Sequence, residues 1–247
     1  MKTGFVFLCL LLTASAATAT ATAPTILLTQ LRGGVYVVQD SFYSQENSAV
    51  YIGEDHVTVI GATWTPETAE MLVKAIGKVT PKPVTEVINT NYHPDRAGGN
   101  AYFKRIGVKI IATVMTVDQM KSGWDAVIAA TRQGFPAYPQ LPLVLPDFTL
   151  PSDFSLQNGA VRAIYTGESH TSDGICVYFP TEKVLYGSCI LKERLGNLDY
   201  ANLTEYPKTL RKLQKLELGF TTIIAGHFSP IHGPELIDQY IRLLSER

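Results

Sequence analysis

Both excess charge and cysteine are scarce in this chain of 247 residues. Lys and Arg together number 21 and Asp and Glu 22, so no excess of positive charge indicates a nucleic-acid partner. Three cysteines are too few for a disulfide-rich scaffold. Hydrophobic residues make up 46% and charged residues 17% of the chain, which is typical of a folded protein and excludes a disordered one.

Long hydrophobic runs are absent too: the run over residues 5–12 is well short of the ~20 residues that a membrane span needs. Lys2 precedes this run, and small residues with Ala-x-Ala patterns follow it. This layout is typical of a secretory signal peptide, with a membrane anchor as the alternative. We therefore predict a signal peptide over residues 1–23, a mature domain over residues 24–247, a periplasmic location and no membrane contact.

Two cysteines remain in the predicted mature domain. In the register that we expect for a hairpin over residues 173–190, Cys176 and Cys189 are diagonal neighbours, about 7–8 Å apart between backbones. This separation exceeds the reach of an unstrained disulfide, so we expect both thiols to be free. A register shift of two residues is the alternative that would pair them.

Strand and helix patterns recur in a similar order along both halves of the chain. Strands are predicted over residues 25–31, 35–39, 49–52, 57–60, 84–89, 108–114, 154–157, 160–165, 173–179, 184–190 and 220–225. Helices are predicted over residues 65–78, 99–106, 116–132, 207–216 and 234–244. The proline-rich stretch 136–151 has neither period and is predicted to be an ordered loop. We expect an α+β sandwich of two sheet-and-helix halves, with the helices outside.

Side chains that can bind a metal follow four different predicted strands. Asn91, His93 and Asp95 alternate after the strand 84–89, so they can point the same way from an extended segment. Three more candidates each lie at the end of a further strand: His170, Cys189 and His227. Each residue taken singly is explained equally well by a structural role. Together they offer imidazole, thiolate and carboxylate, the ligand types that zinc prefers.

This series of residues resembles the metal site of the metallo-β-lactamases. Asparagine at the first position, Asn91, resembles the single-zinc, carbapenem-selective subclass, and the segments 95–100 and 189–193 also agree with the family. The resemblance covers essentially the whole mature chain. It implies an αββα sandwich of two mixed sheets with helices on the outer faces and the site along one sheet edge. It also implies hydrolysis of β-lactams, carbapenems above all, and hence antibiotic resistance.

The chemistry of the ligands predicts one strong and one weak zinc site. Asp95, Cys189 and His227 form the strong set, because two anionic ligands neutralise Zn²⁺ and the thiolate is a soft, strong donor. A second set would contain His93 and His170, but Asn91 adds only a neutral amide oxygen. We therefore predict one tightly bound zinc ion and a weak, inhibitory second site at the two histidines.

The resemblance also implies roles in the reaction. The catalytic residues would be Asp95, His93 and His170, of which the first two are equal candidates for the general base. Zinc would act as a Lewis acid on the departing ring nitrogen. The substrate-binding residues would be Lys192, which pairs with the substrate carboxylate, together with Asn197 and Asn91. A solvated surface lysine is the alternative for Lys192.

Three positions depart from the subclass pattern. Phe228 stands where Asp is usual, Ser188 where Asn is usual and Pro94 where Thr is usual. Phe228 favours one alternative function, a secreted zinc-binding protein without β-lactamase activity. Another hydrolase of the same fold is a further alternative, but it requires histidines at Asn91 and Arg96. We expect a monomer that binds a small β-lactam substrate.

Overall fold

The computed structural model describes residues 23–247. Residues 1–22 of the predicted signal peptide lie outside the described residues. Among the residues that are described, no helix has both the length and the apolar character that crossing a membrane requires.

The first half of the described chain forms a seven-stranded sheet with four helices. Its strands are β1 (Ile26–Arg32), β2 (Val35–Asp40), β3 (Glu46–Ile52), β4 (Val57–Ile60), β5 (Val84–Ile88), β6 (Lys109–Thr113) and β7 (Phe148–Leu150). Its helices are α1 (Pro66–Val79), α2 (Pro94–Ala97), α3 (Asn100–Arg105) and α4 (Val114–Gly134). The strands lie in chain order, antiparallel from β1 to β4 and parallel from β4 to β7.

The second half forms a six-stranded sheet with two α-helices. Its strands are β8 (Phe154–Leu156), β9 (Val161–Ile164), β10 (Cys176–Phe179), β11 (Val184–Tyr186), β12 (Thr222–Ile224) and β13 (Ile231–His232). Its helices are α5 (Tyr206–Lys215) and α6 (Leu236–Ser245), and single 3-10 turns are η1 (Gln157–Gly159) and η2 (Ser188–Ile190). In this second sheet β11 and β12 pair in parallel, and the other neighbouring strands pair antiparallel. Both sheets are therefore mixed.

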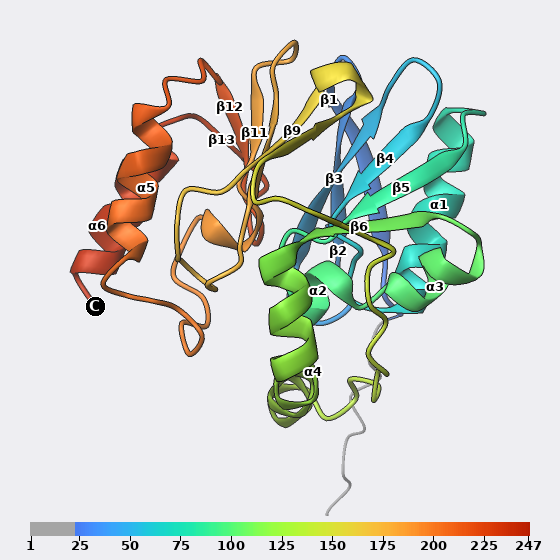
Figure 1. The fold of residues 1–247 in the computed structure, drawn as a ribbon, viewed down its shortest axis with the longest axis horizontal. Helices are drawn as coiled ribbons and strands as arrows, with labels where there is room; N and C mark the ends of the chain where they lie inside the picture. Colours follow the sequence, from blue (N-terminus) through green and yellow to red (C-terminus); the bar gives the residue numbers. More distant parts are fainter. Residues whose placement is uncertain (1–22) are drawn as a thin grey trace, which may run out of the picture.

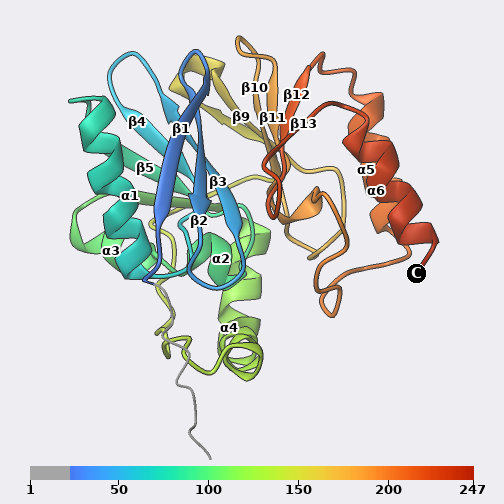
Figure 2. The same cartoon turned by 180° about the vertical axis from the view of Figure 1, so that it is seen from behind.

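The two sheets face each other, and helices cover their outer faces (Figure 1). Apolar side chains from both sheets fill the space between them, among them Ile60 and Val37 from the first and Phe179 and Val177 from the second. α1 and α3 pack on the first sheet, and α5 and α6 on the second. Figure 2 shows the same layers from behind. The predicted αββα sandwich is confirmed, because each sheet buries one face against its partner and the other against helices.

Local signals explain most of the element boundaries. Thr65 caps α1 by accepting the Thr68 amide, with Pro66 in the first turn. α4 begins at Val114, two residues before the predicted start, because the Thr113 hydroxyl is the cap and accepts the Thr116 amide at 3.1 Å.

The expectation for residues 136–151 was wrong in part, because the stretch contains the short strand β7. Phe148 pairs with Ile111 of β6, so the neighbouring strand fixes this element. Three residues are too few to display a period of two in the sequence.

The hairpin of β10 and β11 has the expected register, with Phe179 opposite Val184. Cys176 and Cys189 are both free thiols and both buried, which confirms the prediction that no disulfide joins them.

Candidate metal centre

The loop between β5 and α2 carries the first group of site residues on a rigid support. Asn89 directly follows β5, and its side-chain Nδ2 donates to the Arg96 carbonyl at 2.9 Å and to Asn100 Oδ1 at 2.9 Å. His93 is the residue before α2, with an extended backbone ahead of Pro94. Asp95 therefore lies in the first turn of α2, and both side chains line one cavity.

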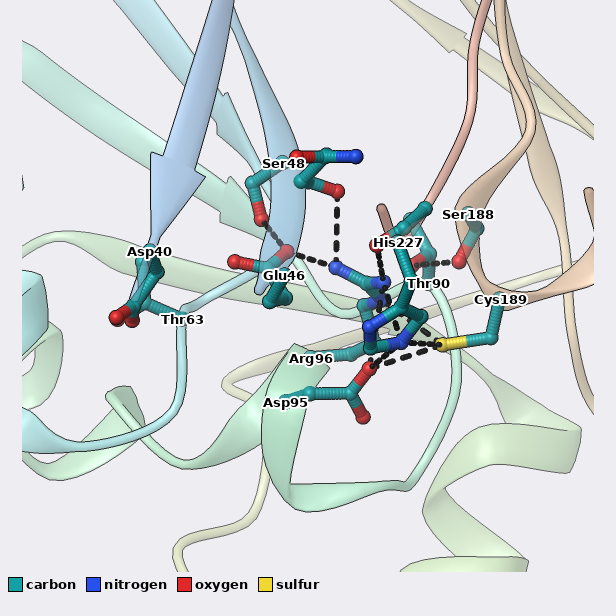
Figure 3. Close-up of polar contacts among 12 residues, drawn as sticks. Asp40, Glu46, Ser48, Thr63, Thr90, Asp95, Arg96, Ser188, Cys189 and His227 are labelled. Atoms are coloured by element: carbon teal, nitrogen blue, oxygen red, sulfur yellow. Dashed lines mark hydrogen bonds and ion pairs between the residues drawn. The ribbon is translucent and has the colours of Figure 1, made fainter. Parts of the chain in front are cut away.

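Three side chains from distant parts of the sequence meet at one point (Figure 3): Asp95 and His227 line the cavity, and the buried Cys189 lies against both. Asp95 Oδ2 lies 3.0 Å from Cys189 Sγ and 3.0 Å from His227 Nε2, and Sγ and Nε2 are 3.8 Å apart. Cys189 belongs to η2 after β11, and His227 to the loop after β12. Within residues 23–247 this is the one cluster of His, Cys, Asp and Glu with metal-binding geometry.

These three donors fit zinc. Donors around a tetrahedral zinc ion lie roughly 3.3–3.6 Å apart, given bond lengths of about 2.0–2.3 Å. The three observed separations lie within a few tenths of an ångström of that range. Burial raises the pKa of the Cys189 thiol to about 11, against the opposing effect of Arg96, so a metal is needed to hold a thiolate there at neutral pH.

A buried arginine lies directly beneath the donors. Arg96 is fully buried, and its Nε lies 3.1 Å from Cys189 Sγ while Nη2 donates to the Gly226 carbonyl at 2.8 Å. Nη1 is ion-paired with Glu46, which is also fully buried. Figure 3 shows this guanidinium between the carboxylate of Glu46 and the donor cluster. Its positive charge favours the anionic forms of Asp95 and Cys189.

Close backbone packing holds the cysteine and histidine loops together. A Cβ atom on Gly226 would lie 1.9 Å from the Ser188 carbonyl oxygen, so only glycine fits here. Ser188 itself has a left-handed backbone (φ 49°), and its hydroxyl bonds to that of Thr90 at 2.7 Å. The segments that carry Cys189 and His227 are therefore held close together by backbone packing.

The other side of the cavity carries two histidines, and within residues 23–247 no carboxylate forms an ion pair with either ring. The rings of His93 and His170 are 5.0 Å apart between centroids and nearly perpendicular. Asn91 turns its Oδ1 toward its own loop, where it accepts the His93 amide at 2.9 Å, and it does not line the cavity. His93 Nε2 is buried without a hydrogen-bond partner among the described residues. Burial lowers the pKa of His93 to about 4, so its ring is neutral.

Lys192 lies beside the histidines. It is only 2% exposed, and its Nζ lies 3.4 Å from His170 Nδ1. Burial lowers its pKa to about 8, against the opposing effect of Cys189 and Asp95. It is therefore not a solvated surface lysine, and within residues 23–247 no carboxylate forms an ion pair with it.

The cavity has a volume of about 530 Å³, which suits a drug-sized ligand. Trp64, Tyr200 and α4 residues such as Val127 form its apolar walls. The polar groups that line it include Lys192, Asn197, Asp199 and the histidines. Asn197 is exposed, and its side chain bonds to Asp199, with Oδ1 accepting the Asp199 amide at 2.7 Å.

The family model described as the metallo-β-lactamase superfamily matches residues 43–227, three quarters of the chain and every candidate metal ligand. The chain belongs to the metallo-β-lactamase superfamily. It is similar to the metallo-β-lactamase type 2 of Bacteroides fragilis, with 27% identity over 100% of this chain and 97% of the relative. The type 2 enzyme of Elizabethkingia meningoseptica is 29% identical over 83% of this chain and 79% of its own length.

Solved structures of metallo-β-lactamases share the fold. The DIM-1 metallo-β-lactamase superposes with a TM-score of 0.78 at 19% identity, over 90% of this chain and 98% of that one. The metallo-β-lactamase from Pontibacter korlensis gives a TM-score of 0.75 at 22% identity, over 90% of this chain and 100% of that one.

Within this metallo-β-lactamase fold, the structure adds two residues that the sequence analysis did not single out as functional. Arg96 follows Asp95 directly, but a buried guanidinium next to a thiolate is a tertiary feature. Glu46 lies in β3, more than forty residues earlier, and nothing in its sequence context marks it as buried. Of the predicted residues, the structure brings Asp95, Cys189 and His227 together and leaves Asn91 outside the cavity lining.

Proposed function

We propose that the protein is a secreted, periplasmic hydrolase that opens β-lactam rings, preferentially those of carbapenems, with a single tightly bound zinc ion. The observation that carries this proposal is the inequality of the two donor sets. Asp95, Cys189 and His227 converge with two potentially anionic donors, whereas Asn91 uses its amide oxygen within its own loop. Relatives named metallo-β-lactamase type 2 support the β-lactam substrate class.

Zinc, when bound by Asp95, Cys189 and His227, supplies a Lewis acid for the negative charge that develops as the ring amide breaks. In the hydrolysis, a water molecule adds to the carbonyl carbon, the C–N bond breaks and the nitrogen gains a proton. The water's proton passes to a nearby base, and His93 and Asp95 are the two candidates. His93 is neutral, and its buried Nε2 has no partner among the described residues, so it can accept a hydrogen bond from this water.

The remaining polar groups orient the substrate. Lys192 supplies a positive charge without a carboxylate partner of its own in the described chain, which suits the carboxylate that β-lactams carry. Asn197 at the rim adds a hydrogen bond, and His170 orients the carbonyl or the water. His93 and His170 would hold a weak second zinc ion, and a ring nitrogen of His93 bound to that ion could no longer accept a hydrogen bond from the water, so the reaction would be inhibited.

The test is hydrolysis of a carbapenem and a penicillin by the purified mature protein while zinc is titrated from one equivalent upward. We expect the carbapenem to be cleaved best at one equivalent and excess zinc to inhibit. Equal cleavage of the penicillin together with activation by added zinc would show a two-metal enzyme. Zinc binding without cleavage of either compound would favour a zinc-binding protein, for which Phe228 is the feature to change next.

A further inference from the structure

A second hollow adjoins the cavity that Asp95 and His227 line, which we call the metal cavity. It has a volume of about 630 Å³, and Phe228 and Ser44 line both hollows, so Phe228 forms part of the wall between them. The lining of the second hollow is mainly polar and includes Gln39, Gln45 and Arg194. A substrate substituent that points away from the metal can therefore pass beside Phe228 into a polar space.

The backbone of Phe228 is held in an unusual conformation. Its φ of 66° lies in the left-handed region, which is uncommon for a bulky side chain and is maintained only by surrounding contacts. Those contacts come from two side chains near the start of β3: Gln45 Nε2 donates to the Phe228 carbonyl at 2.7 Å, and Asn47 Nδ2 donates at 3.1 Å. These bonds hold the backbone of Phe228, and its ring lies beside His227, with 6.1 Å between the ring centroids.

A second contact joins this loop to the segment that carries Lys192. The amide and the hydroxyl of Ser229 both donate to the carboxylate of Glu193, each at 3.2 Å. Arg194 follows directly, and its guanidinium lies 4.1 Å above the centre of the Phe228 ring. Phe228 and Arg194 therefore form an ordered pair at the junction of the two hollows.

The stacking of Arg194 leaves its hydrogen-bonding groups available. A guanidinium over a ring uses one face, while its N–H groups point outward in the plane. Arg194 is exposed, and it makes no ion pair with any residue in the range 23–247. The carboxylate of the neighbouring Glu193 is taken by Ser229.

We propose that Phe228 and Arg194 form a subsite that recognises an aromatic carboxylate on the substrate, remote from the β-lactam ring. The aromatic part packs against Phe228, and the carboxylate accepts two parallel hydrogen bonds from Arg194. This inference rests on the proposed β-lactam hydrolysis and adds a determinant of which substituents are preferred.

The test compares two carbapenems that share the core and the pyrrolidinyl thioether and differ in the terminal amide, a dimethylamide in one and a 3-carboxyanilide in the other. The readout is the ratio of their kcat/KM values, carboxyanilide over dimethylamide, for the zinc-loaded protein. In Arg194→Ala we expect this ratio to fall about five- to tenfold, through loss of a charge-assisted contact at an exposed site. In Phe228→Leu we expect a fall of about two- to threefold, because apolar bulk remains without the aromatic face.

The matched control is Arg211→Ala, which removes an exposed arginine from α5 and should leave the ratio at the wild-type value. Zinc content is measured for each variant, so that loss of metal is distinguished from loss of the subsite. An unchanged ratio in both Arg194→Ala and Phe228→Leu overturns the inference while leaving the proposed function intact. Wild-type protein that cleaves neither compound overturns the proposed function. In that case, the dissociation constants of the two compounds, from tryptophan fluorescence of the zinc-loaded variants, test whether Phe228 and Arg194 bind the aromatic carboxylate.

Discussion

The two sides of the metal cavity contain similar residue types but differ in how their charges are balanced. On one side, Asp95 and Cys189 converge with His227 above the buried guanidinium of Arg96, which is itself paired with Glu46. On the other side, His93 and His170 lie together, no carboxylate in the described part of the chain forms an ion pair with either ring, and Lys192 lies 3.4 Å from His170. The negative charge of the first side suits a metal cation, and the positive charge of the second side suits an anion.

The comparison indicates that the metal affinity of a site depends on more than the identity of its ligands. A histidine pair binds zinc weakly unless a third donor completes it, and here the candidate Asn91 is engaged by the His93 backbone. The residue that contacts a ligand from behind, here Arg96 beside Cys189, matters equally, because it influences the charge that the ligand carries. Four changes test this comparison, beginning with the largest expected effect.

Cys189→Ser removes the soft anionic donor from the stronger side. We expect zinc affinity to fall on the order of 1,000-fold, since a few ligands share a binding free energy of roughly 10 kcal/mol or more. Competition with a chromophoric chelator measures this change. The control is Cys176→Ala, which changes the other buried thiol and should keep one tight zinc ion. Retention of tight zinc by Cys189→Ser would exclude the thiolate as a ligand.

Glu46→Ala removes one of the two ion-pair partners of the buried Arg96 and leaves only Asp95, at 3.3 Å from Nη2. We expect the free energy of unfolding of the metal-free protein to fall by about 3–5 kcal/mol, the usual cost of breaking a buried pair. Chemical denaturation measures it, and Glu54→Ala, at an exposed turn, serves as the control. Glu46→Gln should recover part of the loss, because it keeps the hydrogen bond. A fall below about 1 kcal/mol would mean that Asp95 alone balances the charge of Arg96.

Asn91→His gives the weaker side a third imidazole. We expect the affinity for a second zinc ion to rise about 10- to 100-fold, because a neutral amide oxygen is replaced by a ligand that zinc prefers. Equilibrium dialysis with metal analysis counts the bound ions. Asn91→Ala removes the same hydrogen bond to His93 without adding a ligand, and it should still bind one ion. Equal stoichiometry in both variants would contradict the explanation based on Asn91.

Lys192→Met removes the cation from the histidine side. We expect kcat/KM for a β-lactam to fall roughly tenfold at pH 7, through loss of a charge-assisted contact with the substrate carboxylate. Lysine is charged below its pKa, which burial lowers to about 8, so wild-type kcat/KM should fall as pH rises through about 8. In Lys192→Met, kcat/KM should not show this fall as the pH rises. The control Lys78→Met, at the exposed end of α1, should keep it. A wild-type profile that is flat from pH 7 to 9 would exclude this role.

Much of the fold could be predicted from local patterns. The capping residues of α1 and the similar order of elements in both halves predicted the layers, and the hairpin register of β10 and β11 predicted the unpaired thiols. β7 was missed because its partner β6 determines it. The resemblance to metallo-β-lactamases named every residue of the Asp95, Cys189 and His227 cluster, whose proximity depends on strands of two sheets.

The donor types, the family and the layered fold could be inferred from the amino-acid sequence, because these depend on residue chemistry, motif spacing and hydrophobic period. The burial of Arg96 and Glu46 beneath the thiol, the orientation of Asn91 away from the cavity and the stacking of Arg194 on Phe228 became visible in the three-dimensional structure alone. Burial and charge balance depend on segments far apart in the chain, so no local pattern encodes them.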